Sequence, residues 1–257
     1  MDLGLNGAVA LVTGAKGNIG QAICTALRAE GVQVIATDMA VGAPEAGLDW
    51  HALDVTNEQD WRRVIDDVRA KYGRLDILVN NAGIAPTDRI DTMPLADFRR
   101  AFDINVAGVF LGTQVASALL AESGAKREGG SAIINIASGA ADKPAAFNAC
   151  YCATKAAVSM FTRATALEFS TLGMPVRVNA VHPGAVASDM MDSIVARYVE
   201  LTGRDKDELK AGIGAGHPMG RMVEPAEVAD AVVFLASHAA RYTHAGALHV
   251  DGGQANT

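Results

Sequence analysis

The sequence has few of the residues that build disulfides and zinc sites. Its 257 residues include three cysteines, Cys24, Cys150 and Cys152. No Cys-x-x-Cys pair or Cys/His cluster at zinc-site spacing occurs, and an odd number of cysteines cannot pair completely. We therefore expect reduced thiols in the core and no metal in the functional site.

Long apolar runs and an excess of positive charge are also missing. Hydrophobic residues make up 50% of the chain, yet no uninterrupted apolar run is long enough to span a bilayer. The opening residues, Met1 to Asn6, show no basic segment followed by an apolar core, so we expect no secretory signal and a cytoplasmic protein. The net charge of −7, without a basic stripe, argues against nucleic-acid binding.

No linker, low-complexity segment or internal repeat divides the chain. Apolar runs typical of buried strands alternate with helical patterns as far as the C-terminus. This alternation predicts a single α/β domain over residues 1–257, a doubly wound parallel sheet with helices on both faces. The run Thr56-Asn57-Glu58-Gln59 reads as a capping box that starts a helix, whose apolar face should place Trp61 in the core.

A glycine-rich turn follows the first predicted strand. Residues 8–12 lead into Thr13-Gly14-Ala15-Lys16-Gly17-Asn18-Ile19-Gly20, and a helical pattern then continues to a stop at Gly31. In such a β-α-β unit the turn brings the pyrophosphate of a dinucleotide to the N-terminus of the helix. The sequence therefore predicts a nucleotide site here.

Asp38 ends the second predicted strand of this unit. An acidic residue at this spacing accepts hydrogen bonds from the adenosine ribose and repels a 2′-phosphate, which favours NAD over NADP. Lys16 is the contrary sign, because a lysine in the turn could reach a phosphate, although a solvated loop lysine is the simpler interpretation.

Tyr151 and Lys155 share one face of a predicted helix, because they are four residues apart. A tyrosine hydroxyl acts as an acid or base near neutral pH only if a positive charge favours its anion, and Lys155 could supply that charge. A solvated Tyr/Lys pair at a helix edge is the alternative. The nucleotide motif earlier in the chain favours the catalytic interpretation of the pair.

Together these motifs resemble the short-chain dehydrogenase/reductase family, from Leu5 to Gly253. The middle glycine of the family's Thr-Gly-x-x-x-Gly-x-Gly motif falls on Asn18, a residue type that tolerates positive φ. The resemblance implies NAD-dependent interconversion of a secondary alcohol and a ketone without a metal. It also implies a homotetramer in which helices around 96–122 and 151–171 pair between subunits.

The resemblance assigns roles to further residues. Ser138, at the end of a predicted strand, is implied to orient the substrate oxygen, and Asn105 to hold a helix kink and a water near Lys155. His182, beside a proline turn, is expected to be structural. The expected cofactor contacts are Gly14, Lys16, Asn18, Ile19, Gly20, Asp38, Asp54, Val55, Asn81, Ala82, Gly83, Tyr151, Lys155, Pro183, Gly184, Val186 and Ser188.

Residues 189–220 combine Met190, Met191, Ile194 and Tyr198 with charged residues and several glycines. This mixture predicts a mobile lid over an apolar pocket, with a permanently packed helix pair as the alternative. The segment resembles relatives that act on cyclic or steroid-like alcohols. An NADP-dependent 3-oxoacyl reductase and a non-catalytic nucleotide-sensing protein are the other functions considered.

Overall fold

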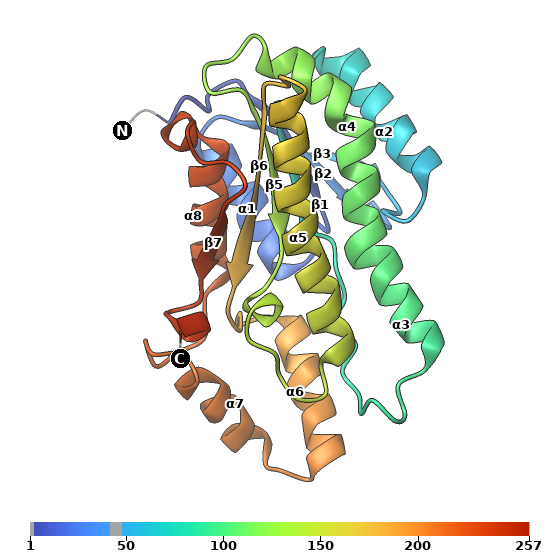
Figure 1. Cartoon of the computed structure of the whole chain (residues 1–257), viewed down its shortest axis with the longest axis vertical. Coiled ribbons are helices and arrows are strands. Elements are labelled where there is room, and N and C mark those ends of the chain that lie inside the picture. Colours follow the sequence, from blue (N-terminus) through green and yellow to red (C-terminus); the bar gives the residue numbers. More distant parts are fainter. Residues whose placement is uncertain (1–2, 42–47, 257) are drawn as a thin grey trace.

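Parallel strands form one seven-stranded sheet in the order β3-β2-β1-β4-β5-β6-β7 (Figure 1). The computed structural model describes residues 3–41 and 48–256. Because the strand order reverses between β1 and β4, a crevice for a ligand is expected at their carboxyl ends. The strands are β1 (Val9–Thr13), β2 (Gln33–Asp38), β3 (Leu48–Ala52), β4 (Ile77–Asn80), β5 (Ser131–Ile136), β6 (Val176–Pro183) and β7 (Ala247–Val250).

Helices cover both faces of the sheet, as the sequence predicts. One face carries α1 (Asn18–Ala29) and α8 (Pro225–Ala236), which contact each other. The other carries α2 (Glu58–Tyr72), α4 (Gly108–Gly124) and α5 (Ala149–Thr171). A short α3 (Leu95–Phe102) continues through a π turn, η1 (Asp103–Ala107), into α4. Below the carboxyl ends of the strands lie α6 (Asp189–Thr202) and α7 (Lys206–Ala215) (Figure 1).

Burial on both faces explains the continuous apolar strands. Along β1, Val9 and Leu11 belong to the cluster under α2, α4 and α5, whereas Ala10 and Val12 belong to the cluster under α1 and α8. Successive side chains of a strand point to opposite faces, so a doubly covered strand is mostly apolar along its whole length. Trp61 is fully buried, as predicted, and all three cysteines are buried thiols outside any disulfide.

The predicted start of α2 is wrong by one residue. Asn57 is the N-cap, and its side chain accepts the N–H groups of Gln59 and Asp60 at 2.9 and 3.3 Å. Thr56 instead donates its hydroxyl to Asp54 at 2.7 Å. A nearby carboxylate therefore captures the threonine, and the asparagine takes the capping position.

One helical stretch, Leu95–Gly124, has the length and composition of a membrane span. In the 18-residue window concerned, 44% of the residues are buried in the protein, and α4 packs on α2 and on β4, β5 and β6. The stretch is not an uninterrupted apolar run, since it includes the buried polar residues Asn105 and Thr113. A core helix beneath a sheet has the same composition, and we interpret α4 in that way.

Candidate active site

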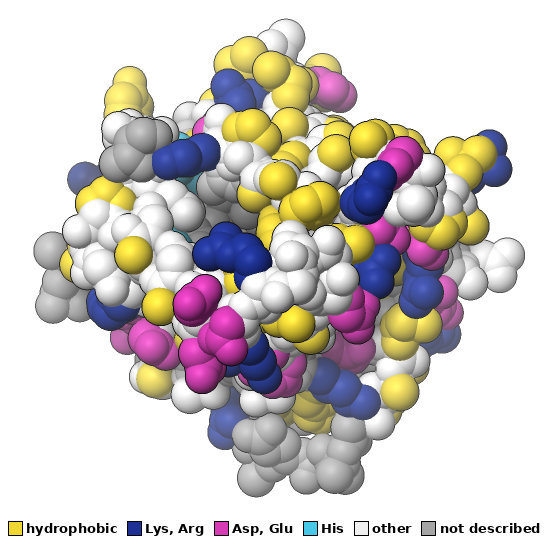
Figure 2. Space-filling model, turned by 90° about the horizontal axis from the view of Figure 1, so that it is seen from below, with side chains coloured by type: hydrophobic (Ala, Val, Ile, Leu, Met, Phe, Trp, Pro, Cys, Tyr) yellow, Lys and Arg dark blue, Asp and Glu magenta, His cyan; other side chains and the backbone are white. Residues whose placement is uncertain are grey.

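A cavity of about 1150 Å³ opens at the carboxyl edge of the sheet, the end seen in Figure 2. Most of the predicted site residues line it, whereas Lys16 and Asn105 do not. The predicted residues in its wall are Gly14, Asn18, Ile19, Gly20, Asp38, Asp54, Val55, Asn81, Ala82, Gly83, Ser138, Tyr151, Lys155, Pro183, Gly184, Val186 and Ser188.

The turn between β1 and α1 requires glycine at two positions. Gly14 has φ +63°, and a Cβ atom there would lie 2.9 Å from the Cα of Ala82. A Cβ atom on Gly20 would collide with the carbonyl oxygen of Gly14. Gly17, the N-cap of α1, provides no side-chain cap, so backbone N–H groups of the first turn are left for an anion beside the cavity. This cradle fits the pyrophosphate of a dinucleotide.

Asn18 occupies the family's middle glycine position for a different reason from the one expected. It is the first residue of α1 and does not have a positive φ. Its side-chain Oδ1 instead accepts the N–H of Asp189, the first residue of α6, at 3.0 Å. The side chain thus joins the nucleotide turn to a helix that lies 171 positions along the chain.

Asp38 closes β2 at the edge of the cavity. Its carboxylate accepts the N–H of Lys16 at 3.1 Å and that of Met39 at 2.9 Å. These bonds hold the carboxylate at the end of the strand. The side chain of Lys16 is exposed, and the residue is tied to Asp38 through its backbone.

The segment after β4 is fastened to the end of β1. Thr13 Oγ1 accepts the N–H groups of Asn81 and Ala82, both at 3.0 Å. The side-chain amide of Asn81 donates to the carbonyl oxygens of Thr13 and Gly14 at 2.9 and 3.1 Å. These bonds fix the walls of the crevice on both sides of the topological switch.

Ser138, Tyr151 and Lys155 lie together in the cavity wall. Lys155 Nζ donates to the carbonyl oxygen of Ile136 at 2.7 Å and lies 5.7 Å from the centre of the Tyr151 ring. Burial raises the pKa of Tyr151, and a hydrogen bond with Ser138 acts in the opposite direction. Burial also lowers the pKa of Lys155 to about 8, which still leaves the amine mostly charged at neutral pH.

Asn105 lies behind this wall, inside the π turn η1. Its Oδ1 accepts the N–H of Ile84 at 2.9 Å, and its Nδ2 donates to the Ile84 carbonyl at 2.8 Å and to Thr154 Oγ1 at 3.0 Å. A Cβ atom on Gly83 would lie 3.2 Å from Asn105 Oδ1 and 3.6 Å from Lys155 Nζ. The asparagine therefore connects the β4 end to α5, one residue before the lysine, and the helix is irregular where the resemblance implied a kink.

Two histidines have structural environments next to this wall. His217, which the sequence reasoning missed, is buried, and its Nε2 accepts the N–H of Ala185 at 3.1 Å. Its position directly before Pro218 gives no sign of this contact in the sequence. His182 is fully buried and does not line the cavity, as expected for a structural residue.

Helices α6 and α7 cover the cavity with apolar side chains, and α6 is fastened to its rim. Tyr198 donates its hydroxyl to the Ala146 carbonyl and accepts the amide of Asn148 at 2.9 Å. Its ring meets that of Phe147 edge-on, with centroids 5.5 Å apart, and Phe147 itself has φ 62°. The apolar residues of the two helices that line the cavity are Met190, Met191, Ile194, Leu209 and Ile213.

Comparison with known proteins shows which family the chain belongs to. The family described as Enoyl-(Acyl carrier protein) reductase matches residues 14–255. Cyclopentanol dehydrogenase from Comamonas sp. is 35% identical over 261 residues, which cover 97% of each chain. The chain belongs to the short-chain dehydrogenase/reductase family.

Further members of this short-chain family extend the comparison. The 3-beta-hydroxysteroid dehydrogenase of Comamonas testosteroni is 36% identical over 256 residues, covering 96% of this chain and 95% of the relative. The structure of 3-ketoacyl-(acyl-carrier-protein) reductase from Brucella melitensis, complexed with NADH, has a TM-score of 0.85 and 30% identity, covering 98% of this chain and 99% of that chain. The protein is therefore a nicotinamide-dependent oxidoreductase of the alcohol dehydrogenase and ketone reductase type, which confirms the expected class of enzyme.

Proposed function

We propose that this enzyme uses NAD to interconvert a bulky, mainly apolar secondary alcohol and its ketone. One observation carries the proposal. A single cavity is lined by the glycine cradle, by Asp38 at its adenosine end and by Ser138, Tyr151 and Lys155 at its other wall. Binding and proton transfer can therefore occur within one enclosed space.

Each residue of the wall has a chemical task in this proposal. Tyr151 exchanges the proton of the substrate hydroxyl, and the Lys155 ammonium stabilises the tyrosinate that results. Ser138, which lies with Tyr151 in the cavity wall, orients the substrate oxygen towards it. The nicotinamide, when bound, supplies the hydride exchange with the substrate carbon. Asn105 supports the lysine through Thr154 and the Gly83 segment.

The proposed preference for NAD depends on Asp38. Its carboxylate is held at the end of β2 by two backbone N–H groups and lines the cavity. A 2′-phosphate placed there would meet a fixed negative charge, whereas a ribose hydroxyl would find an acceptor. The exposed side chain of Lys16 lies outside the cavity wall, so its expected phosphate contact has little support.

The proposed substrate class depends on the cover of the cavity. The methionines and aliphatic residues of α6 and α7 present an apolar surface above the wall that carries Tyr151. Two relatives are named for cyclopentanol and for a 3-beta-hydroxysteroid. We therefore propose a cyclic secondary alcohol, and we propose that residues 189–220 act as its lid.

A 3-oxoacyl thioester is the second candidate substrate. Three basic residues, Arg100, Lys143 and Arg204, also line the cavity, and they could meet a phosphate-bearing carrier at its mouth. The Brucella reductase shows that such an enzyme shares this fold. We give this candidate second place because the cover of the cavity is mainly apolar.

Self-association and location complete the proposal. We propose a homotetramer assembled through α4 and α5, whose outward surfaces expose Phe110, Met160 and Leu167. Buried thiols outside any disulfide are compatible with the reducing cytoplasm, which we retain as the proposed location.

The test is a substrate panel assayed with purified protein. Cyclic secondary alcohols, their ketones and a 3-oxoacyl thioester are each supplied with NAD(H) or NADP(H), and absorbance of the reduced nicotinamide is followed. We expect turnover of a cyclic alcohol with NAD, and loss of at least about a hundredfold in Tyr151→Phe, which keeps the ring and loses the proton carrier. A Tyr151→Phe rate within about tenfold of the wild type would refute the assigned role. Exclusive turnover of the thioester would favour the second candidate.

A further inference from the structure

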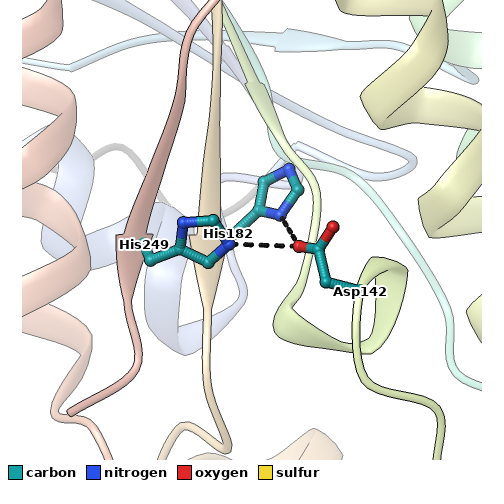
Figure 3. Close-up of side chains that lie close together, drawn as sticks. All are labelled: Asp142, His182 and His249. Carbon is teal, nitrogen blue, oxygen red and sulfur yellow. Dashed lines mark hydrogen bonds and ion pairs between the residues drawn. The ribbon is translucent and has the colours of Figure 1, made fainter. Parts of the chain in front are cut away.

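A cluster of two histidines and one aspartate lies outside the cavity wall formed by the cofactor and catalytic residues. Asp142, His182 and His249 come from three different elements and point towards one another (Figure 3). Asp142 follows η2 (Gly139–Ala141), His182 is near the end of β6, and His249 is on β7. His182 and His249 lie 40 and 107 positions after Asp142 in the chain, so no spacing in the sequence indicates the cluster.

One carboxylate oxygen is at the centre of the cluster. Asp142 Oδ2 lies 2.7 Å from His182 Nδ1 and 3.1 Å from His249 Nε2. One ligand atom from each residue can be chosen so that all three lie within 4.8 Å of one another. Zn²⁺ bound to nitrogen and oxygen at about 2.0 to 2.1 Å needs ligand atoms about 3.4 Å apart in a tetrahedron. The two oxygen–nitrogen distances would have to lengthen by about 0.7 and 0.3 Å, and the two histidine nitrogens, now within 4.8 Å of each other, would settle at about the same 3.4 Å separation.

The cluster combines a fixed ligand with two that can adjust. The His182 side chain is fully buried, whereas 39% of the Asp142 side chain and 35% of the His249 side chain are exposed. An ion can therefore enter from solvent and draw the two exposed side chains towards the rigid histidine. Water can occupy the remaining coordination position, as it does where zinc has three protein ligands.

Each histidine has a ring nitrogen beside Asp142 that can present a lone pair to an ion. His182 Nε2 has no partner among the described residues. In the tautomer that carries its proton on Nε2, the Nδ1 lone pair faces Asp142, and an ion bound there would replace the contact between Nδ1 and the carboxylate. Two neutral imidazoles and one carboxylate would then form a donor set that suits Zn²⁺ and neighbouring divalent transition metals.

We infer that Asp142, His182 and His249 form a structural site for a divalent transition-metal ion of the zinc type. The ion would fasten the segment after Ser138 to the carboxyl ends of β6 and β7. The ion would lie outside the proposed proton-transfer wall, so its effect is on stability. The inference of this metal site does not depend on the proposed substrate or cofactor.

The test uses untagged full-length protein stripped of metal by a chelator. Zn²⁺ is titrated by calorimetry, Co²⁺ is used as a spectroscopic probe, and melting temperature is measured with and without each ion. The variants are His249→Ala and Asp142→Asn, both at partly exposed positions. The matched control is His51→Ala, because His51 also lies between two carboxylates, those of Asp49 and Asp67, at 3.3 and 3.5 Å.

We expect one Zn²⁺ per chain, a higher melting temperature with Zn²⁺, and visible absorption typical of tetrahedral Co²⁺. Affinity should fall at least about tenfold in His249→Ala and Asp142→Asn, and remain unchanged in His51→Ala. Circular dichroism of the metal-free variants checks that they fold. Absence of stoichiometric binding by the wild type, undiminished binding by folded His249→Ala, or loss of binding in His51→Ala would each overturn the inference.

Discussion

At the scale of single residues, Asp38 should set the cofactor preference. We expect the wild type to use NAD at least about tenfold more efficiently than NADP, which corresponds to about 1.4 kcal/mol of transition-state binding. Asp38→Ala should narrow that ratio, because the charge facing the 2′-phosphate is removed. The measurement is kcat/KM with each cofactor, and Lys16→Ala is the control. A wild-type preference for NADP that Lys16→Ala abolishes would reverse the interpretation of both residues.

The pKa of Lys155 predicts a pH profile. Ketone reduction needs Tyr151 protonated and Lys155 charged. Burial raises the pKa of Tyr151 and lowers that of Lys155 to about 8, so the lysine loses its proton first as the pH rises. The kcat/KM for reduction should therefore be level at neutral pH and fall as the pH rises through about 8.

Lys155→Arg provides the check on that assignment. A guanidinium stays protonated throughout this range, so the residual activity of the variant should lack the falling limb. The same limb in the variant would assign it to another group. A wild-type profile without a limb near pH 8 would contradict the lowered pKa.

Local spacing was sufficient to find Tyr151 and Lys155, because four residues in a helix always bring side chains to one face. The glycine motif also placed Asn18 in the nucleotide turn, but the sequence did not indicate that its side chain bonds to Asp189. Its bond to Asp189 spans 171 positions and depends on where α6 lies in three dimensions. The same limit explains why His217 and the histidine–aspartate cluster had no signal in the sequence.

At the scale of elements, α6 and α7 should change mobility when ligands bind. Their apolar residues gain burial only when a substrate occupies the cavity, so amide hydrogen exchange over residues 189–220 should slow with NAD and a substrate analogue present. The helices are well formed in the structure. Equally strong protection with and without ligands would support the packed helix pair instead of a lid.

Asn18→Gly tests how the nucleotide turn communicates with α6. The change restores the family's glycine and removes the acceptor for the Asp189 N–H. We expect NAD alone to protect α6 in the wild type and to protect it several-fold less in the variant, with NAD affinity changed little. Ser193→Gly, which removes a side chain bonded only within α6, is the control for a general loss of helicity. Equal protection by NAD in the wild type and Asn18→Gly would show that the bond carries no coupling.

Element type was easier to predict than element ends. The apolar period identified strands and helices, but the start of α2 depended on which of two adjacent polar residues a neighbouring carboxylate would capture. The sequence predicted a mobile lid over 189–220 without placing helix ends in it, whereas Ser188 and Asp205 cap two helices there through their side chains.

At the scale of the whole molecule, the outer surfaces of α4 and α5 should hold the subunits together. Met160 and Leu167 are 60% and 63% exposed and lie seven residues apart on one face of α5. Replacing both with glutamate should dissociate the expected tetramer, because buried unpaired charges are costly at an interface. Light scattering after gel filtration measures the mass. The control is Ile90→Glu, at an exposed apolar position outside both helices. A monomeric wild type, or a tetramer unaffected by the double change, would contradict the expectation.

The fold itself was predictable because alternating strands and helices allow few topologies once right-handed crossovers are required. The strand order confirms the doubly wound arrangement. The volume and shape of the cavity were not predictable, since they depend on how α6 and α7 pack against loops that precede them by about forty residues or more.

The residues that line the nucleotide end of the cavity and those that cover it come from separate parts of the chain. The turn after β1, the end of β2 and the segment after β4 precede residue 84, whereas the apolar cover comes from residues 189–216. The later segment can thus be exchanged while the residues of the nucleotide turn and of the β2 and β4 ends stay the same. Asn18 is the exception, since it reaches Asp189 in that segment. A chimaera that imports residues 189–216 from a relative should acquire the donor's substrate range, and should function best when residue 18 is imported with it.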